Sequence, residues 1–161
     1  MKNKRNIIKK SKFWIWIPIW LLILGILYYF ISLVINIKTR IPKVCSEDIC
    51  FTVELATTIE EREQWLMYRQ AMSETHGMLF VFPQYDFHNF WMKNTLIPLD
   101  MIRMDEKHKI VRILTADACK ADPCPVYRPE TYSSYVLEIN AGLAKKYNIT
   151  EWTTLQFKHI R

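Results

Sequence analysis

Residues 87–101 read FHNFWMKNTLIPLDM and place a His, a Lys, two Asn and an Asp among aromatic and aliphatic side chains. From His88 to Asn94 the side chains alternate between two faces, and a period of two favours a strand. The segment TLIP contains a proline and predicts a turn, after which LDMIRM begins a second strand. We therefore expect this stretch to lie at the heart of the fold, where its polar groups either make structural contacts or line a ligand pocket.

The flanking segments predict the rest of the domain. Short runs that are apolar, or that alternate with a period of two, predict strands within 44–56, 77–82, 88–94, 99–104, 109–114, 134–139 and 153–160. The first of these ranges reads as a hairpin, and Pro83 is expected to end the strand at 77–82. Helices are predicted at 57–72 and 140–149, the second with Asn140 as its N-cap. The sequence thus predicts an α+β domain on a mainly antiparallel sheet or small barrel.

The helix predicted after the first hairpin carries a capping signal and two cations. Thr58 and Glu61 have the spacing of a capping box. Arg62 and Arg69 lie seven residues apart and hence on one helical face. We expect these two arginines to form ion pairs with Glu138. The alternative is that they hold an anionic ligand, because a guanidinium matches the geometry of a carboxylate.

An apolar segment near the N-terminus is long enough to cross a membrane. Residues 13–37 contain no charge, and a helix of 25 residues extends about 37 Å against a hydrocarbon core of about 30 Å. Residues 1–12 hold six Lys and Arg and no acid, which orients the N-terminus toward the cytoplasm. A cleaved signal peptide is the alternative, but no alanine precedes Ala56 to form a small-residue cleavage site. We expect a cytoplasmic tail at 1–12, a transmembrane anchor at 13–37, a linker at 38–44 and an extracytoplasmic domain at 45–161.

The charge balance of the remaining chain argues against nucleic-acid binding. The chain has 22 Lys and Arg and 16 Asp and Glu, and because the first 12 residues hold six of the basic residues, 16 remain against 16. A nucleic-acid-binding face requires an excess of cations in the folded domain. We therefore expect no nucleic-acid partner. The chain has three glycines, which are too few for a Gly-rich phosphate-binding loop.

The four cysteines form two pairs with the same spacing, CSEDIC and CKADPC. In an oxidising compartment this pattern predicts the disulfides Cys45–Cys50 and Cys119–Cys124, whereas in a reducing one it predicts a structural zinc site. Free thiols, or bridges between the two pairs, are a third alternative. The topology inferred from the N-terminal charges favours the disulfides, and we expect no metal and no cofactor. The C-x-x-C spacing of thiol redox catalysts is absent.

Five segments carry a resemblance to a known family: FTVELATTIEEREQWLMYR, GMLFVF, FWMKNTLIPLDMI, CKADPCPVY and YVLEINAG. They resemble the successive motifs of the domain-of-unknown-function 192 family over about residues 45–157. The resemblance implies a compact, mainly β domain with short helices, in a family that is often secreted or membrane-anchored, and it implies no known activity. The chain departs from the family pattern at Trp65, where a Gly is usual, and at TEWTTLQF, which replaces a usual Gly-Asp.

The polar groups of the opening stretch form the candidate site. Because a buried charge needs a partner, we expect an ion pair between Lys93 and Asp100 across the TLIP turn, with Asn94 bonded to the turn backbone. These contacts can be purely structural, or they can form the polar floor of a pocket walled by aromatic side chains. The candidate ligand-binding residues are Arg69, His88, Trp91, Lys93, Asn94 and Asp100.

Two functions from different classes stay open at this point. The first is a non-enzymatic module, held at the outer face of the cytoplasmic membrane by a single helix, that binds a small molecule, a glycan or another envelope component. The second is an envelope enzyme, such as a hydrolase, in which Asp100 acts as base, Lys93 stabilises an anion and His88 transfers protons. The sequence favours the first, because it contains no recognisable nucleophile or metal motif.

Overall fold

The computed structural model describes residues 3–38, 41–64 and 66–160. The chain divides into two compact units, residues 1–40 and 41–161. Thr39 and Arg40 of the predicted linker and Trp65 of the predicted helix lie outside the described residues.

The first unit is one long helix, α1 (Asn3–Lys38). Its segment Ile17–Ile35 is long and apolar enough to cross a membrane, and none of this segment is buried. The predicted basic tail and the predicted apolar span therefore share one continuous helix from Asn3 onward. Both membrane anchors and signal sequences contain an apolar helix near the N-terminus, so the helix alone leaves its processing open.

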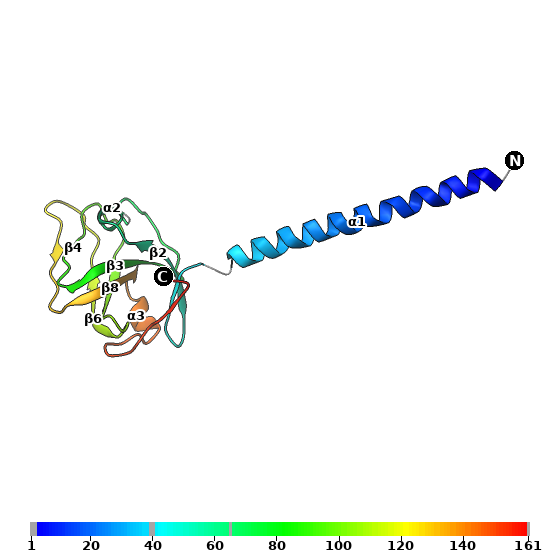
Figure 1. Cartoon of the computed structure of the whole chain (residues 1–161). Coiled ribbons are helices and arrows are strands. Elements are labelled where there is room, and N and C mark those ends of the chain that lie inside the picture. Colours follow the sequence, from blue (N-terminus) through cyan, green and yellow to red (C-terminus); the bar gives the residue numbers. More distant parts are fainter. Residues whose placement is uncertain (1–2, 39–40, 65, 161) are drawn as a thin grey trace. The chain divides into compact units, whose positions relative to one another are not determined.

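The second unit is built on a curled sheet of seven strands in the order β6-β5-β8-β3-β2-β1-β9 (Figure 1). Its strands are β1 (Lys43–Cys45), β2 (Cys50–Ala56), β3 (His76–Asp86), β5 (Leu99–Met104), β6 (Ile110–Ala116), β8 (Ser133–Asn140) and β9 (Gln156–Lys158). A separate ribbon pairs β4 (Phe90–Trp91) with β7 (Val126–Tyr127). Two short helices, α2 (Ile59–Gln64) and α3 (Leu143–Lys146), complete the unit. The predicted α+β class is confirmed.

One pair of strands departs from the predicted antiparallel arrangement. β2 and β3 run parallel, because the connection between them contains α2 and returns the chain in the same direction. The other neighbours in the large sheet are antiparallel. The curl brings the two edges together at one point, where Lys109 before β6 pairs with Thr154 before β9. The sheet is thus a half-barrel.

Alternation along the strands gives the sheet two buried faces, each with its own core. The α3 face packs its apolar side chains against α3 and includes Val53, Leu79, Ile102, Leu137, Ile139, Leu143 and Ala144. The opposite α2 face packs against the segments around α2 and β4 and includes Ala56, Leu66, Met78, Phe80, Phe90, Met101 and Val136. Figure 1 shows α2 and α3 on opposite sides of the sheet.

The predicted capping box is confirmed at the start of α2. The Glu61 amide donates to Thr58 Oγ1 at 3.2 Å, and the Thr58 amide donates to Glu61 Oε2 at 3.0 Å. The helix, however, ends at Gln64 and is much shorter than predicted. Arg69 consequently lies outside the helix, and the argument that placed it on one helical face with Arg62 does not hold.

The predicted N-cap of α3 is wrong. Asn140 belongs to β8, where it pairs with Leu99 of β5 and so continues the ladder by one residue beyond the expected end. The N-cap is Gly142, whose φ of 85° lies in the left-handed region that glycine tolerates best. The Asn140 side chain instead donates to the Met72 carbonyl at 2.8 Å.

Two boundaries around the opening stretch also differ from the predictions. The strand predicted at 88–94 is confined to Phe90–Trp91, and Asn94 has a φ of 58° that ends the extended conformation. Pro83 does not end β3, which continues to Asp86. The ladder between β3 and β8 is irregular between Val81 and Asp86, and a residue without an amide hydrogen is tolerated where the ladder is interrupted.

Both predicted disulfides are present. Cys45–Cys50 joins the paired ends of β1 and β2, and Cys119–Cys124 closes the loop before β7. The first confirms the predicted hairpin at this place, and the second ties down a segment that follows β6. No cysteine among the described residues is free.

Gly77 on β3 sets the distance between the two central strands. A Cβ atom at this position would lie 2.8 Å from the Glu138 carbonyl oxygen and 3.0 Å from Ile139 Cγ2. Because real Cβ atoms do not approach a backbone oxygen so closely, glycine is required for β3 to pack against β8 here. This close approach fixes the backbone of Glu138, which proves central to the site.

Candidate functional site

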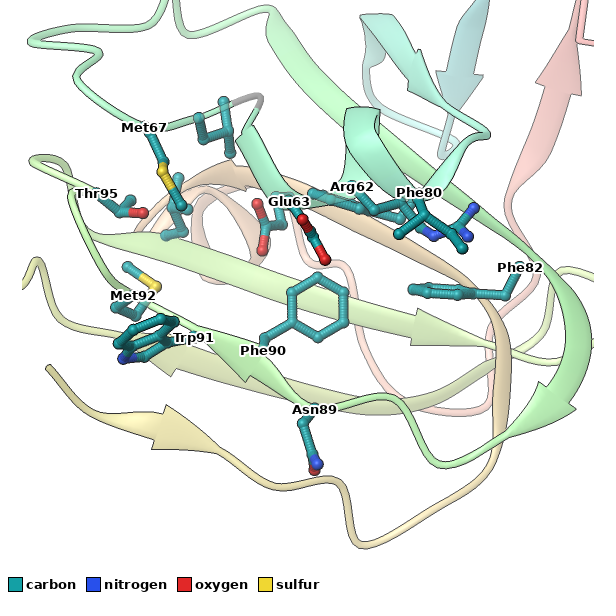
Figure 2. Close-up of a pocket in the computed structure, with 14 residues that line it drawn as sticks. Arg62, Glu63, Met67, Phe80, Phe82, Asn89, Phe90, Trp91, Met92 and Thr95 are labelled. Carbon is teal, nitrogen blue, oxygen red and sulfur yellow. The ribbon is translucent and has the colours of Figure 1, made fainter.

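A cavity of about 530 Å³ opens on the α2 face of the sheet (Figure 2). Its walls are largely aromatic and thioether groups, contributed by Phe80, Phe82, Phe90, Trp91, Met67 and Met92. Three of its lining residues have ionisable side chains, namely Arg62, Glu63 and Glu138. Figure 2 shows the Phe90 ring in the middle of the pocket, with Glu63 above it and Phe82 toward one end. This volume is within the range that small-molecule sites occupy.

Arg62 is held at the cavity wall by the backbone. Its Nη1 donates to the Thr57 carbonyl at 2.5 Å and to the Val81 carbonyl at 3.1 Å. Its guanidinium carbon lies 5.2 Å from the centroid of the Phe82 ring, a cation–π distance. Arg62 therefore does not pair with Glu138 as predicted, because two carbonyls and an aromatic ring already orient it.

The register of the sheet brings two charged side chains together beneath the cavity. Glu138 of β8 lies opposite Met101 of β5, so Arg103, two residues further along β5, is its diagonal neighbour on the same face. The Arg103 guanidinium carbon is 5.2 Å from the centroid of the Phe90 ring. Phe90 lines the cavity, and so Arg103 lies directly behind one wall of it.

Burial controls the ionisation of both groups. Glu138 is 4% exposed and Arg103 is 0% exposed. Loss of solvation raises the pKa of Glu138 to about 8, although the attraction of Arg103 works in the opposite direction. The same loss of solvation lowers the pKa of Arg103 to about 10. At neutral pH Glu138 is therefore mainly protonated while Arg103 keeps its charge, and the floor of the site carries a net positive charge.

The pKa of Glu54, on the same face, is shifted in the opposite direction to that of Glu138. Both of its oxygens accept from Arg69, at 2.7 and 2.5 Å, and His76 Nε2 lies 3.0 Å from Oε1. The hydrogen bonds from Arg69, against a smaller effect of burial, lower the pKa of Glu54. Arg69 was predicted to pair with Glu138, and the structure gives it Glu54 instead. The pair is partly exposed and lies outside the cavity lining.

Comparison with known sequences identifies the family to which this domain belongs. The sequence profile of the domain-of-unknown-function 192 family, described as "Uncharacterized ACR", matches residues 42–157. The chain belongs to this family. The resemblance seen in the sequence motifs is thereby confirmed, and the matched segment contains the whole cavity lining.

Two solved structures are similar to this domain-of-unknown-function 192 protein. A protein from Sinorhizobium meliloti 1021, described as a "putative transcription regulator", is 33% identical with a TM-score of 0.65, and the match covers 72% of this chain and 91% of that one. A protein of unknown function from Novosphingobium aromaticivorans DSM 12444 is 31% identical with a TM-score of 0.63, and the match covers 72% of this chain and 83% of that one. No curated protein matches the chain.

One of the predicted site residues of this domain-of-unknown-function 192 protein lines the cavity, and a second packs on that residue. The lining residue is Trp91, and Lys93 Nζ lies 4.7 Å from the centroid of the Trp91 ring. Asn94 does not line the cavity but supports its wall, because its Nδ2 donates to the Tyr68 hydroxyl at 2.7 Å and its carbonyl accepts from the Tyr68 amide at 2.7 Å. These bonds tie the TLIP turn to the segment that contains Met67.

Asp100 faces away from the cavity. On β5 it alternates with Met101 and therefore projects toward α3. One of its oxygens accepts from Thr115 Oγ1 at 2.7 Å, and the other accepts from the Ala144 amide at 3.0 Å. The predicted ion pair between Lys93 and Asp100 is not formed, since the two side chains belong to opposite sides of the sheet.

His88 packs beside the cavity rather than into it. Its ring stacks on Phe82 with centroids 3.6 Å apart, and Nε2 lies 3.2 Å from the Gln84 carbonyl oxygen. Burial lowers the pKa of His88, so the ring is neutral at pH 7. The structure thus does not bring His88, Lys93 and Asp100 together around one point. Within the described residues there is also no cluster of His, Cys, Asp or Glu able to hold a metal.

Sequence reasoning missed Arg103 altogether and named Glu138 only as an ion-pair partner. A signal was present in both cases, because Glu138 is the one charge in SYVLEI, and in LDMIRM Arg103 lies between two apolar residues, on the strand face opposite to that of Asp100. Burial of a charged side chain is energetically unfavourable, so a charge within such a strand indicates a partner, a change of protonation or a ligand. Phe80 and Phe82 were predicted as strand residues, but their common wall with Phe90 required knowledge of the strand order.

Proposed function

We propose that this protein is a membrane-anchored, extracytoplasmic module that binds a small molecule in the cavity on the α2 face. The observation that carries the proposal is the cavity of about 530 Å³ itself, with aromatic walls and a single buried carboxyl group, Glu138. Apolar walls with few polar groups are the usual composition of small-molecule sites.

Binding is favoured over catalysis by the contacts of the polar side chains. Asp100 is fully engaged with Thr115 and the Ala144 amide on the far face. His88 is stacked on Phe82 and placed against the Gln84 carbonyl. A general base needs to reach the same substrate atom as its partners, and these groups do not converge. We do not extend the regulatory description of the Sinorhizobium protein to this chain, because the charges outside its first 12 residues balance.

The membrane location is supported by three features. α1 contains a segment able to cross a membrane, six basic residues precede that segment, and the second unit contains two disulfides. Disulfides persist in oxidising compartments, and basic residues stay on the cytoplasmic side. These features fit a domain on the outer side of the cytoplasmic membrane.

A protease test checks this topology. In intact spheroplasts that express the chain with an N-terminal epitope tag, added protease is expected to degrade the second unit and leave a short tagged fragment. The reason is that the tag lies in the cytoplasm while residues 41–161 lie outside. Degradation of the second unit only after lysis contradicts the orientation. Loss of the tag from mature protein before any protease is added indicates cleavage of a signal sequence.

A protein-observed titration tests the binding function. The full chain, with ¹³C-labelled methionine methyl groups and held in lipid nanodiscs, is titrated with 3-phenylpropanamide, a neutral aromatic probe. Met67 and Met92 line the cavity, whereas Met104 lies in the core of the α3 face. We expect saturable shifts of the Met67 and Met92 resonances, with Met104 unchanged.

Two variants make this titration specific. Asn89→Trp places a large ring at the exposed edge of the lining and is expected to abolish the shifts. Trp152→Ala is a control outside the cavity, because Trp152 is an exposed ring, 5.0 Å from Lys109 Nζ, that is not among the lining residues, and this variant should leave the shifts unaltered. Shifts that stay unaltered in Asn89→Trp, or that are absent from the wild-type chain, contradict the proposed function.

A further inference from the structure

Arg103 is a buried cation whose hydrogen-bonding capacity is unused. None of its three nitrogen atoms has a hydrogen-bond partner among the described residues. A guanidinium carries five N–H donors, and it is strongly disfavoured to leave them without acceptors in the interior. The side chain is 0% exposed, so bulk solvent does not reach it. Such a group is stabilised by an acceptor or by a negative charge nearby, and the described residues supply it with no hydrogen-bond acceptor.

The position of Arg103 directs this requirement to the cavity. Its guanidinium packs on the Phe90 ring. Phe90 lines the cavity, and Figure 2 shows its ring in the middle of the pocket. Its diagonal neighbour Glu138 lines the cavity directly. The unused polar group nearest to the cavity in the described part of the chain is therefore the Arg103 guanidinium, in contact with the lining residue Phe90.

The surrounding charges do not cancel that of Arg103. Glu54 is already occupied by Arg69, and Glu138 is mainly protonated at neutral pH because its pKa is about 8. The other charged or titratable groups around the α2 face are Arg62, Glu63, His76, His88 and Lys93. Of these, Glu63 is exposed at the outer wall. The interior of the site is therefore positive.

We propose that the cavity binds a monocarboxylate with an apolar or aromatic body, whose carboxylate accepts a hydrogen bond from Glu138 and lies in the positive field of Arg103. The body of the ligand fills the space between Phe80, Phe82 and Trp91. This inference rests on the proposed binding function and adds the chemical class of the ligand.

Three probes of one shape test the charge preference. The labelled full chain in nanodiscs is titrated with 3-phenylpropionate, with its neutral analogue 3-phenylpropanamide and with the cation 3-phenylpropylamine. The Met67 and Met92 resonances report on each. We expect the carboxylate to bind about tenfold to a hundredfold more tightly than the amide, from the attraction of one buried positive charge in a protein environment. We expect the amine to bind more weakly than the amide.

Arg103→Met is the decisive variant. It keeps an unbranched apolar side chain in place of the aliphatic part of the arginine and removes an unpartnered buried charge, so the fold is expected to persist, which the Met78 and Met101 resonances check. The carboxylate should lose its advantage while the amide binds as before. Arg112→Met, on the neighbouring strand, removes a partly exposed arginine that pairs with Glu130 and Glu151, and it should change neither affinity.

The pH dependence gives a second, independent readout. Above about pH 8 Glu138 becomes an anion, and the affinity of the wild-type chain for 3-phenylpropionate should fall about tenfold per pH unit. Glu138→Gln keeps a donor and does not titrate, so its affinity should stay constant. Three results overturn the carboxylate inference and leave the binding function standing. They are equal binding of carboxylate and amide, tighter binding of the amine, and an Arg103→Met chain that still prefers the carboxylate. Failure of all three probes overturns both.

Discussion

Between pH 5 and pH 8 the folded domain should lose about 3–4 kcal/mol of stability through Glu138 alone, and Glu138→Gln should remove this loss. The pKa of Glu138 is about 8 in the folded protein because burial disfavours its charged form. An unfolded chain exposes the same group, with a pKa of about 4.3. Across this window the folded state holds a proton that the unfolded state has released.

The direction of the effect follows from proton linkage. Stability falls with rising pH wherever the folded state binds more protons than the unfolded state. The contribution of protonated Glu138 is therefore complete below about pH 4 and decreases up to the folded pKa of about 8. Two histidines act in the opposite sense, because burial lowers the pKa of His88 and of His108. The difference between the wild-type chain and Glu138→Gln isolates the carboxyl group, since both chains keep these histidines.

Urea denaturation of the labelled full chain in nanodiscs measures this difference. The folded and unfolded intensities of the Met78 and Met101 methyl resonances give the free energy of unfolding at each pH, because both side chains lie in the core beside Glu138. Glu54→Gln is the control. The pKa of Glu54 is lowered, so the carboxylate stays ionised between pH 5 and pH 8, and its stabilising contribution is lost only as the pH falls through the lowered pKa. A stability difference between wild type and Glu138→Gln that does not change from pH 5 to pH 8 contradicts the buried, protonated carboxyl group.

The elements of this fold could be predicted where local pattern decides them. The apolar run in β3, the alternation in β5 and β6 and the capping box at Thr58 and Glu61 all depend on neighbours in sequence, and each is present. The two disulfides close loops of equal short length, so their pairing could be predicted from the spacing together with the compartment that the N-terminal charges indicate. Boundaries failed where distant strands intervene, as at Asn140, whose pairing with Leu99 extends β8.

The candidate site was harder to predict for a physical reason. A period of two states which residues share a face of one strand, but not which strands lie side by side. Glu138 and Arg103 become neighbours only because β8 lies between β3 and β5. Lys93 and Asp100 are close in sequence and were expected to pair, yet the turn between them places Asp100 on the face toward α3. Charge attraction across a turn was outweighed by the alternation of the strand that follows it.

Asp100→Ala should destabilise the folded domain by about 2–4 kcal/mol. Asp100 is 2% exposed, and each of its oxygens accepts one hydrogen bond, from Thr115 Oγ1 and from the amide of Ala144 in α3. Hydrogen bonds to a charged group contribute about 1.5–3 kcal/mol each, and their removal leaves the buried Ala144 amide without an acceptor. The same urea titration of the methionine resonances measures the loss.

Conservative variants separate this structural role from a role in binding. Asp100→Asn keeps one acceptor and should cost about 1–2 kcal/mol, and Thr115→Val removes one donor at an exposed position and should cost about 1 kcal/mol or less. Because Asp100 projects away from the cavity, folded Asp100→Asn should bind 3-phenylpropanamide with the affinity of the wild-type chain. If Asp100→Asn instead keeps full stability and loses binding, then this carboxylate belongs to the ligand site and the assignment of the two faces is wrong. The free energy of unfolding distinguishes the two results, because the Asp100 carboxylate accepts from the Ala144 amide and so joins β5 to α3.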